Sequence, residues 1–310
     1  MKIFKLRRLI QILSTLLHNG YIGFFSTGSI YTGYLKSFCG PGLNCYSCPA
    51  ALFSCPLGAI QQIMISARLL PLSYLSQAFF YVLSQVLLFS LLLGRFVCGW
   101  LCPFGFFQEI LYKIPFYKRE FHLPFRVERY VKHLLLIFFV FLFPVLFIKE
   151  IGYGILWFCK YLCPAGTLEA GYFNLLINPS LKNKIGYIFA LKSFLLILIL
   201  LFCIMEIRFF CKNLCPLGLI YGIFNKFSFL RLRWEDRACN RCSLCEKICP
   251  MNLKIPQELN SVECIRCLNC LELCPKKAIH LEKTFIYLPE RYQIKLSVGE
   301  LKHESRRKSL

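Results

Sequence analysis

The chain has 310 residues, of which 57% are hydrophobic and 16% aromatic, and its mean hydropathy is +0.55. A composition this apolar excludes an ordinary soluble protein and indicates membrane-spanning segments. The chain carries 37 Lys and Arg against 16 Asp and Glu, a formal net charge of +21. These basic residues flank apolar runs and form no stripe of their own, which favours membrane lipid over nucleic acid as their partner.

Four apolar runs have the length of a membrane span. They cover residues 9–28, 77–97, 133–149 and 186–206. Pro144 predicts a kink or a tilt in the third run, and Lys192 in the fourth is expected to extend its amine toward an interface. The segment 57–76 contains Arg68 and Pro71, and it is predicted to be an interfacial helix.

The distribution of basic residues predicts the orientation in the membrane. The N-terminal segment (four) and the loop 95–132 (seven) together hold eleven Lys and Arg, whereas the two loops expected on the other side hold six. No small-residue cleavage site ends the first apolar run, which is therefore expected to be a retained span. We predict an integral protein of the cytoplasmic membrane with its termini and its C-terminal domain on the cytoplasmic side.

Changes in composition divide the chain into three parts. Residues 1–228 are predicted to form an α-helical membrane domain with about four transmembrane helices in two tandem repeats. Residues 229–284 are more polar and rich in cysteine, and they are predicted to form an α+β bacterial-type 2[4Fe-4S] ferredoxin domain. Residues 285–310 form a basic tail.

Two copies of the bacterial ferredoxin motif C-x2-C-x2-C-x3-C-P lie in the C-terminal domain, as CNRCSLCEKICP at 239–250 and CIRCLNCLELCP at 264–275. Three thiolates of each copy bind one [4Fe-4S] cluster, and the fourth binds the other cluster. The spacing therefore predicts cluster 1 on Cys239, Cys242, Cys245 and Cys274, and cluster 2 on Cys264, Cys267, Cys270 and Cys249. Eight structural thiols or two zinc sites are the alternatives, but a zinc site usually takes two Cys pairs and not two interleaved sets.

A second cysteine motif recurs in the membrane domain. RFVCGWLCPFG at 95–105 and RFFCKNLCPLG at 208–218 share the frame R-F-x-C-x-x-L-C-P-x-G, displaced by 113 residues (98 to 211 and 102 to 215). Cysteines four apart project from one face of a helix, and the Pro and Gly that follow are expected to end it. We predict a further cluster at the cytoplasmic ends of the second and fourth spans, held by Cys98, Cys102, Cys211 and Cys215. Unliganded buried thiols are the alternative.

The opposite side of the membrane domain carries a less regular set. FCKYLCPAG at 158–166 lacks only the arginine of the frame, and FCGPGLNCYSCPAALFSCPLG at 38–58 holds four cysteines. Alignment of the Cys-Pro pairs places Ala51 where a first ligand should stand, which leaves Cys45 or Cys48 to replace it. An outer cluster would draw on Cys45, Cys48, Cys55, Cys159 and Cys163, across an apolar slab of about 30 Å. Spare thiols, Cys39 among them, or a disulfide are the alternatives.

A ferredoxin run combined with C-x3-C-P motifs at span ends resembles the NapH-type family of polytopic membrane 4Fe-4S proteins, whose relatives include NosR-type regulators and accessory proteins of cbb3-type oxidases. The resemblance covers nearly the whole chain. It implies electron transfer between a cytoplasmic donor or a quinol pool and a membrane or extracytoplasmic redox partner. The two C-x3-C-P motifs of the family match the pairs Cys98/Cys102 and Cys211/Cys215, whereas the outer set lies beyond the family pattern.

Together these patterns predict a membrane-bound electron-transfer protein with two [4Fe-4S] clusters in the ferredoxin domain and one or two more in the membrane domain. A quinol, a reductase or a ferredoxin donor would be its redox partner. Arg95 and Arg208 are predicted to tune the inner cluster, because arginine stabilises negative charge; contact with lipid headgroups is the alternative. The alternative function is that of a maturation or regulatory protein that reduces a metal or senses redox state. The sequence shows no independent substrate site, so an enzymatic activity of its own stays open.

Overall fold

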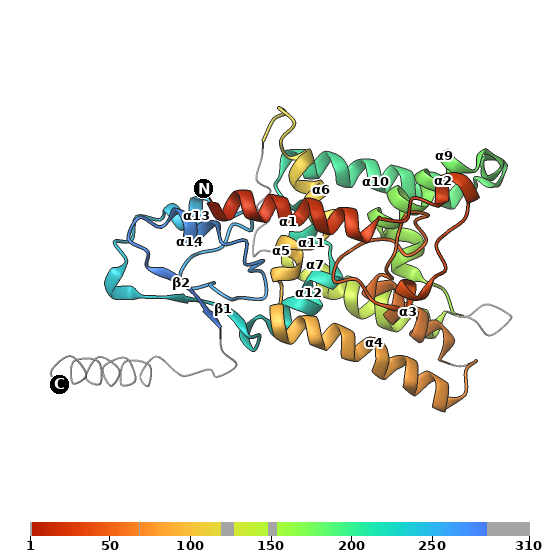
Figure 1. The fold of residues 1–310 in the computed structure, drawn as a ribbon, viewed down its shortest axis with the longest axis horizontal. Helices are drawn as coiled ribbons and strands as arrows, with labels where there is room; N and C mark the ends of the chain where they lie inside the picture. Colours follow the sequence, from red (N-terminus) through yellow and green to blue (C-terminus); the bar gives the residue numbers. More distant parts are fainter. Residues whose placement is uncertain (1, 68, 119–126, 148–153, 284–310) are drawn as a thin grey trace.

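The computed structural model describes residues 2–67, 69–118, 127–147 and 154–283. Four long helical segments form a bundle, and a small domain with a two-stranded sheet lies at the end of the bundle where the chain begins (Figure 1). The long segments are α1 (Lys2–His18), α4 (Leu72–Leu93), α10 (Tyr187–Met205) and the continuous run of α7 (Val127–Leu134), η3 (Leu135–Leu142) and α8 (Phe143–Leu146).

Within the described residues, α4 and α10 are long and apolar enough to cross a membrane, and Tyr130–Leu146 is a shorter apolar helix. The first predicted span, 9–28, is wrong at both ends: α1 starts in the basic N-terminal segment and stops at His18, where Gly20 and Gly23 follow. The second predicted span also ends early, at Leu93, because Gly94 adopts a φ of 55° that a helix cannot continue.

The segment 57–76 is not the interfacial helix that its composition predicts. It contains α3 (Pro56–Ser66) and the first turn of α4, with Pro71 as the residue that precedes the new helix. Pro cannot extend a preceding helix but is tolerated where one begins. Leu57 and Gln61 of α3 are fully buried, and α3 packs against α4, η3 and α8, so this helix lies inside the bundle.

The third apolar run contains a stretch of π-helix, Leu135–Leu142, directly before Pro144. Pro has no backbone N–H to donate, and a wider helical turn absorbs the missing hydrogen bond. The irregularity expected from Pro144 is therefore present as a change of helix type.

Helix α1 turns its polar side inward. The side chains it buries are Arg7, Gln11, Ser14 and His18. Its exposed side chains include Leu9, Leu13, Leu16 and Leu17, each more than half exposed. This distribution is the reverse of the amphipathic pattern of a helix on a water-soluble protein.

Short elements connect the long helices and shape the interior. The N-terminal half adds α2 (Phe24–Thr27), η1 (Tyr34–Ser37), α5 (Phe96–Trp100) and α6 (Pro103–Leu111). The second half adds η4 (Phe158–Leu162), η5 (Gly166–Tyr172), α9 (Phe173–Ile177), η6 (Pro179–Lys184), α11 (Phe209–Asn213), α12 (Pro216–Ile223) and η7 (Phe224–Lys226). The two copies of the R-F-x-C-x-x-L-C-P-x-G frame thus form the same pair of short helices, α5–α6 and α11–α12.

The small domain has the α+β build expected of a ferredoxin. Strand β1 (Leu230–Trp234) pairs antiparallel with β2 (Ile279–Lys283), and η8 (Asp236–Ala238), α13 (Leu244–Lys247) and α14 (Asn269–Leu273) lie between them in the chain. Left-handed residues occur at matching positions of the two cysteine motifs, Arg241 and Arg266 and then Ser243 and Leu268, and again two residues after each motif, at Asn252 and Lys277, with φ between 49° and 64°. Such alternation turns successive N–H groups toward one concave side of each loop, as in other cluster-binding loops.

Candidate metal centres

Sixteen of the nineteen cysteines line four cavities, with four cysteines in each. In the small domain these are ferredoxin cavity 1 (Cys239, Cys242, Cys245, Cys274) and ferredoxin cavity 2 (Cys249, Cys264, Cys267, Cys270). In the bundle they are the inner cavity (Cys98, Cys102, Cys211, Cys215) and the outer cavity (Cys45, Cys55, Cys159, Cys163). Cys39, Cys48 and Cys203 line none of these four.

Each ferredoxin cavity brings together the quartet of cysteines that the interleaved spacing predicts. Ferredoxin cavity 1 measures about 1020 Å³, opens to the surface and includes the exposed Cys242. Ferredoxin cavity 2 measures about 350 Å³, and three of its cysteines are buried. Arg266 lines this second cavity, and its guanidinium donates to the carbonyl of Leu93 and to Ser228 Oγ.

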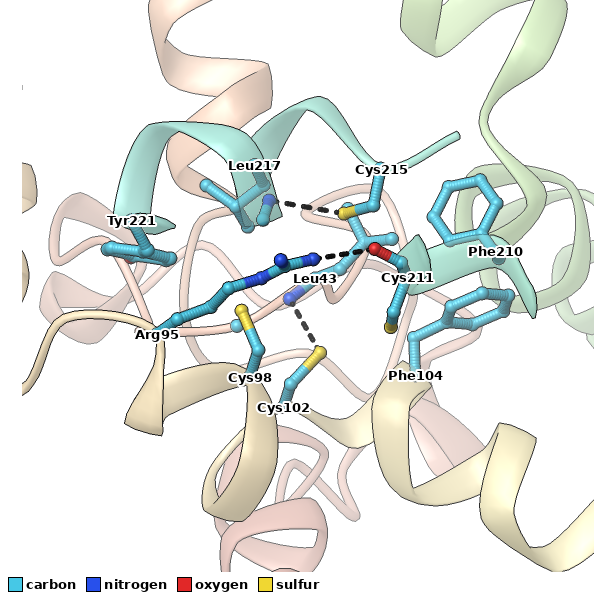
Figure 2. A pocket seen from close by; sticks show the side chains of 12 residues that line it. Leu43, Arg95, Cys98, Cys102, Phe104, Phe210, Cys211, Cys215, Leu217 and Tyr221 are labelled. Carbon is cyan, nitrogen blue, oxygen red and sulfur yellow. Dashed lines mark hydrogen bonds between the residues drawn. The ribbon is translucent and has the colours of Figure 1, made fainter. Parts of the chain in front are cut away.

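The inner cavity, about 330 Å³, lies between the two copies of the frame, and Figure 2 shows the sulfur atoms of its four cysteines converging on it. The spacing predicted that the two cysteines of a copy project from one face of a single helix. This prediction is wrong, because the two cysteines do not lie on the same helix. Cys98 lies on α5, whereas Cys102 is the residue that precedes α6, and the second copy repeats this with Cys211 and Cys215. The Cys-Pro pair therefore begins a helix and does not end one, because Pro suits the first helical position.

Backbone and side-chain N–H groups donate to the sulfur atoms of the inner cavity, and Figure 2 shows two of the backbone bonds, to Cys102 and Cys215. Cys102 Sγ accepts from the N–H of Gly105 at 3.4 Å and from that of Leu43 at 3.3 Å. Cys215 Sγ accepts from Gly218 at 3.4 Å, and Cys211 Sγ accepts from Nε2 of the buried Gln108 at 3.1 Å. Donors aimed at sulfur stabilise the thiolate form that a cluster requires.

The two arginines of the frame are fully buried and cross between the copies. Arg95 Nη2 donates to the carbonyl of Cys211, and Arg208 Nη1 donates to the carbonyl of Cys98, both at 2.6 Å. A Cβ at Gly218 would lie 3.0 Å from the Arg95 guanidinium, which explains a glycine at this position of the frame. Contact with lipid headgroups, the alternative role for these arginines, is wrong because neither side chain reaches the surface.

The inner cavity also holds polar atoms that lack a partner. Tyr221 Oη and Arg95 Nε are buried, line the cavity region and make no hydrogen bond. Four thiols and two unsatisfied donors around an enclosed space fit an anionic iron–sulfur group, which would accept from both donors. In an empty apolar core, the unpartnered hydroxyl of Tyr221 and Nε of Arg95 would each carry an uncompensated desolvation cost.

The loops that line the inner cavity and ferredoxin cavity 2 are in direct contact. Gly99, between the cysteines of α5 and α6, packs so closely that a Cβ there would lie 2.4 Å from the carbonyl oxygen of Ile265. Trp100 Nε1 donates to the carbonyl of Arg266 at 3.0 Å. Ile265 and Arg266 lie in the loop between two cysteines of ferredoxin cavity 2, so two stretches of backbone separate the cavities.

An ion pair secures the same junction. Arg95 Nη1 donates to Glu263 Oε2 at 2.8 Å and to the carbonyl of Val262 at 2.8 Å, and Lys132 pairs with the same carboxylate. Burial disfavours the charged form of Glu263, but Arg95 and Lys132 outweigh it and hold the pKa of this carboxyl at about 2. The residue before Cys264 is therefore ionised and fixed to the arginine of the inner cavity.

The outer cavity is larger, about 1090 Å³, and more open. It takes Cys45 from the 38–58 segment, whereas Cys48 lies outside it with its sulfur 4.0 Å from Asn19 Oδ1. Lys192, expected to reach an interface, instead lines this cavity and donates to the carbonyl of Cys159 at 3.3 Å. All nineteen cysteines are free thiols, so the disulfide alternative is not formed.

The outer and inner cavities are neighbours, which corrects the expectation of a full apolar slab between them. Leu43 lines both cavities. On α10, Lys192 lies at the outer cavity and Cys203 lies 3.6 Å from Gln108 of the inner one. The step of eleven residues from Lys192 to Cys203 corresponds to roughly 16 Å along the axis of α10, about half of the apolar slab that was expected between the cavities. The 38–58 segment folds back into the bundle, a course that hydropathy does not reveal.

In the described parts of the chain, no three His, Cys, Asp or Glu side chains lie close enough to hold a single metal ion. The cysteine quartets instead surround cavities, as ligands of a four-iron cluster must.

Comparison with known proteins identifies the same segments. A family model described as "4Fe-4S binding domain" matches residues 77–124 and 188–235, each of which contains one copy of the frame. Protein MJ0750 of Methanocaldococcus jannaschii, named as uncharacterized, is 30% identical over 205 residues, which cover 64% of this chain and 77% of that protein. No solved structure matches.

Two further relatives carry descriptive names. The putative electron transport protein YccM of Escherichia coli is 26% identical over 228 residues, 71% of this chain and 60% of YccM. The ferredoxin-type protein NapH of Haemophilus influenzae is 28% identical over 123 residues, 35% of this chain and 43% of NapH. The chain thus spans 60% of YccM and 43% of NapH, less than two thirds of either. The shared 4Fe-4S segments and the named relatives confirm the resemblance noted above, and the chain belongs to the NapH-type family of ferredoxin-type iron–sulfur proteins.

Proposed function

We propose that this protein is a membrane-bound electron-transfer protein whose ferredoxin cavities and inner cavity form one continuous path. The observation that carries the proposal is the junction at Gly99 and Ile265, where the loops of two cysteine quartets touch. An iron–sulfur role agrees with the family, whose named members include an electron transport protein and a ferredoxin-type protein.

The ligands of this proposal follow the four-cysteine cavities. Cluster 1 is assigned to Cys239, Cys242, Cys245 and Cys274, and cluster 2 to Cys249, Cys264, Cys267 and Cys270. The inner cluster is assigned to Cys98, Cys102, Cys211 and Cys215. Bound [4Fe-4S] clusters would supply one-electron chemistry at these places.

The protein itself holds the sites at fixed separations and controls their access to water. Exposure falls from ferredoxin cavity 1, with Cys242 at the surface, to the inner cavity, where all four cysteines are buried. A graded path of this kind lets a partner protein approach at the domain surface and keeps water from the interior sites. Arg95 and Arg208 place positive charge against the inner quartet, which favours the more negative, reduced state.

The membrane location rests on the outward-facing side chains of the bundle. Only 17% of the most apolar window of α4, and the same share for α10, is buried inside the protein. Helix α1 exposes leucines while it buries Arg7 and Gln11. Hydrocarbon is the surrounding in which this inside-out distribution is favourable. The basic N-terminus and the ferredoxin domain then face the cytoplasm by the positive-inside rule.

Iron and sulfide quantification on protein purified anaerobically in detergent, combined with EPR after reduction, tests this function. We expect at least about twelve irons per chain, which corresponds to clusters 1 and 2 and the inner cluster. Reducible signals that reoxidise when a quinone or an electron-accepting protein is added would support a conduit. About eight irons per chain, or zinc in place of iron, would overturn the inner cluster and with it the continuous path.

A further inference from the structure

The outer cavity is built from the same parts as the inner cavity. The sequence Cys-Pro-x-Gly occurs four times in the bundle, at 55–58, 102–105, 163–166 and 215–218. At the outer cavity the N–H of Gly166 donates to Cys163 Sγ at 3.3 Å, which matches the 3.4 Å bonds of Gly105 and Gly218 at the inner cavity. Cys55 precedes α3 with Pro56 at its first position, as Cys102 precedes α6.

The sixth residue after the cysteine of each Cys-Pro-x-Gly sequence supplies a second match. These residues are Gln61, Gln108, Glu169 and Tyr221. Three of these side chains make a hydrogen bond to the opposite member of their pair of motifs: Gln108 Nε2 donates to Cys211 Sγ, and Gln61 Oε1 accepts from the N–H of Cys159 at 3.2 Å. Residue 169 follows the same rule, because Glu169 Oε2 accepts from the N–H of Cys45 at 2.5 Å.

This rule identifies the ligand that the sequence left undecided. At the inner cavity and at Cys159, the contacted residue is the first cysteine of a pair. Glu169 contacts Cys45, so Cys45 takes the place of a first cysteine for the motif that begins at Cys55. Cys48 does not line the cavity and does not take part in this pattern.

Cationic side chains complete the match. Arg95 and Arg208 donate to carbonyls of first cysteines at the inner cavity, and Lys192 donates to that of Cys159 at the outer one. Lys36 donates to the carbonyl of Ala51 at 2.7 Å, at the position of the missing cysteine in the frame. A cation therefore contacts the carbonyl at position 51 as well, although Ala51 does not lie on a helix as Cys98 and Cys211 do, and another part of the loop supplies the thiol.

We propose that the outer cavity binds a further [4Fe-4S] cluster through Cys45, Cys55, Cys159 and Cys163. The ligand set does not depend on the electron-transfer function above, although the role of this cluster does. Leu43 lies between the outer and inner cavities, so the added cluster extends the path into the bundle. Two of its ligands, Cys45 and Cys159, are partly exposed, in contrast to the fully buried inner quartet. The path would therefore be open at both ends and closed in the middle.

The test compares metal content in the full-length wild type and in two neighbouring cysteine variants, Cys45→Ser and Cys48→Ser. All are purified anaerobically, and iron, sulfide and zinc are quantified per chain. The wild type should contain about sixteen irons, and Cys45→Ser should lose about a quarter of them. Cys48→Ser is the matched control and should keep the full content. The EPR signals of clusters 1 and 2 serve as the check on folding.

The possible results separate this proposal from the function proposed above. About twelve irons in the wild type, or twelve with one zinc, would overturn the outer cluster and leave the continuous path intact. About eight would overturn both. Loss of iron in Cys48→Ser with full content in Cys45→Ser would overturn the ligand set. If Cys45→Ser does not fold, Cys163→Ser and the wild-type iron count decide in the same way.

Discussion

Arg95 and Glu263 form a buried ion pair of 2.8 Å across the junction between the helical bundle and the ferredoxin domain. Arg95 also donates to the carbonyl of Cys211, and Glu263 is followed by Cys264. One arginine therefore connects a proposed ligand of the inner cluster with the loop of ferredoxin cavity 2. This contact fixes how the two sites lie relative to each other, and it is the natural place to perturb first.

Replacement Arg95→Gln should lower the midpoint potential of the inner cluster, because a positive charge that stabilises its reduced state is lost. It should also destabilise the junction by about 3–5 kcal/mol, since Glu263 is left with less compensation while buried. Potentiometric titration followed by EPR measures the first effect, and thermal unfolding measures the second. The double variant Arg95→Gln/Glu263→Gln should recover much of the stability and keep the lowered potential. An unchanged potential in both variants would contradict the tuning role.

Gly99 provides a test of the electron path itself. A Cβ at this position would lie 2.4 Å from the Ile265 carbonyl oxygen, so Gly99→Ala must push the two loops apart, at a cost of about 1–3 kcal/mol. We expect an unchanged iron content but slower electron equilibration between clusters 1 and 2 and the inner cluster, measured by rapid-mixing absorbance after reduction. Gly186→Ala is the matched control, because nothing lies within 4 Å of a Cβ there. Equal rates in the two variants would exclude the junction as the route.

The proposed membrane location predicts a specific sensitivity on α10. Ile197 is 55% exposed in the middle of this helix and faces outward. Ile197→Lys should therefore impair membrane insertion by roughly 2.5–3.5 kcal/mol, whereas the same change in a water-soluble protein would be nearly neutral. Membrane fractionation and carbonate extraction measure the result. Leu35→Lys, at an exposed residue outside the long helices, is the control. Full retention of Ile197→Lys in the membrane would count against a lipid-facing α10.

Sequence spacing groups the cysteines of the ferredoxin domain in the same quartets as the structure does, because these cysteines lie in two short loops. It also paired the inner cysteines, since the 113-residue repeat implies symmetry. Spacing could not choose between Cys45 and Cys48 as the cysteine that lines the outer cavity, because the loop that holds them does not repeat the frame. It also did not predict how deep in the bundle the outer cavity lies. That depth depends on the 38–58 segment folding back so that Leu43 reaches Cys102, a long-range contact without a local signal. The polar residue six positions after the cysteine of each Cys-Pro-x-Gly sequence was visible in the sequence but has meaning only once the contacts are known.

Tyr221 is the member of this set that lacks a hydrogen-bond partner, although its side chain is fully buried at the inner cavity. Its counterpart Gln108 already donates to Cys211 Sγ at 3.1 Å. A displacement of 113 residues relates Gln108 to Tyr221 and Cys98 to Cys211, so the phenol should donate to the Cys98 side of a bound cluster. A hydrogen bond to sulfur stabilises the reduced state and raises the potential.

Tyr221→Phe removes only this donor and should lower the midpoint potential of the inner cluster with no loss of iron. A hydrogen bond to a charged acceptor contributes about 1.5 kcal/mol, which corresponds to about 60 mV for a one-electron couple. Tyr117→Phe, at an exposed tyrosine, is the control and should leave the potential unchanged. Redox titration monitored by EPR measures the midpoint potential of the inner cluster in both variants. A potential in Tyr221→Phe equal to that of the wild type would mean that the phenol does not face the cluster, and the 113-residue symmetry would then not extend beyond the cysteines and arginines of the frame.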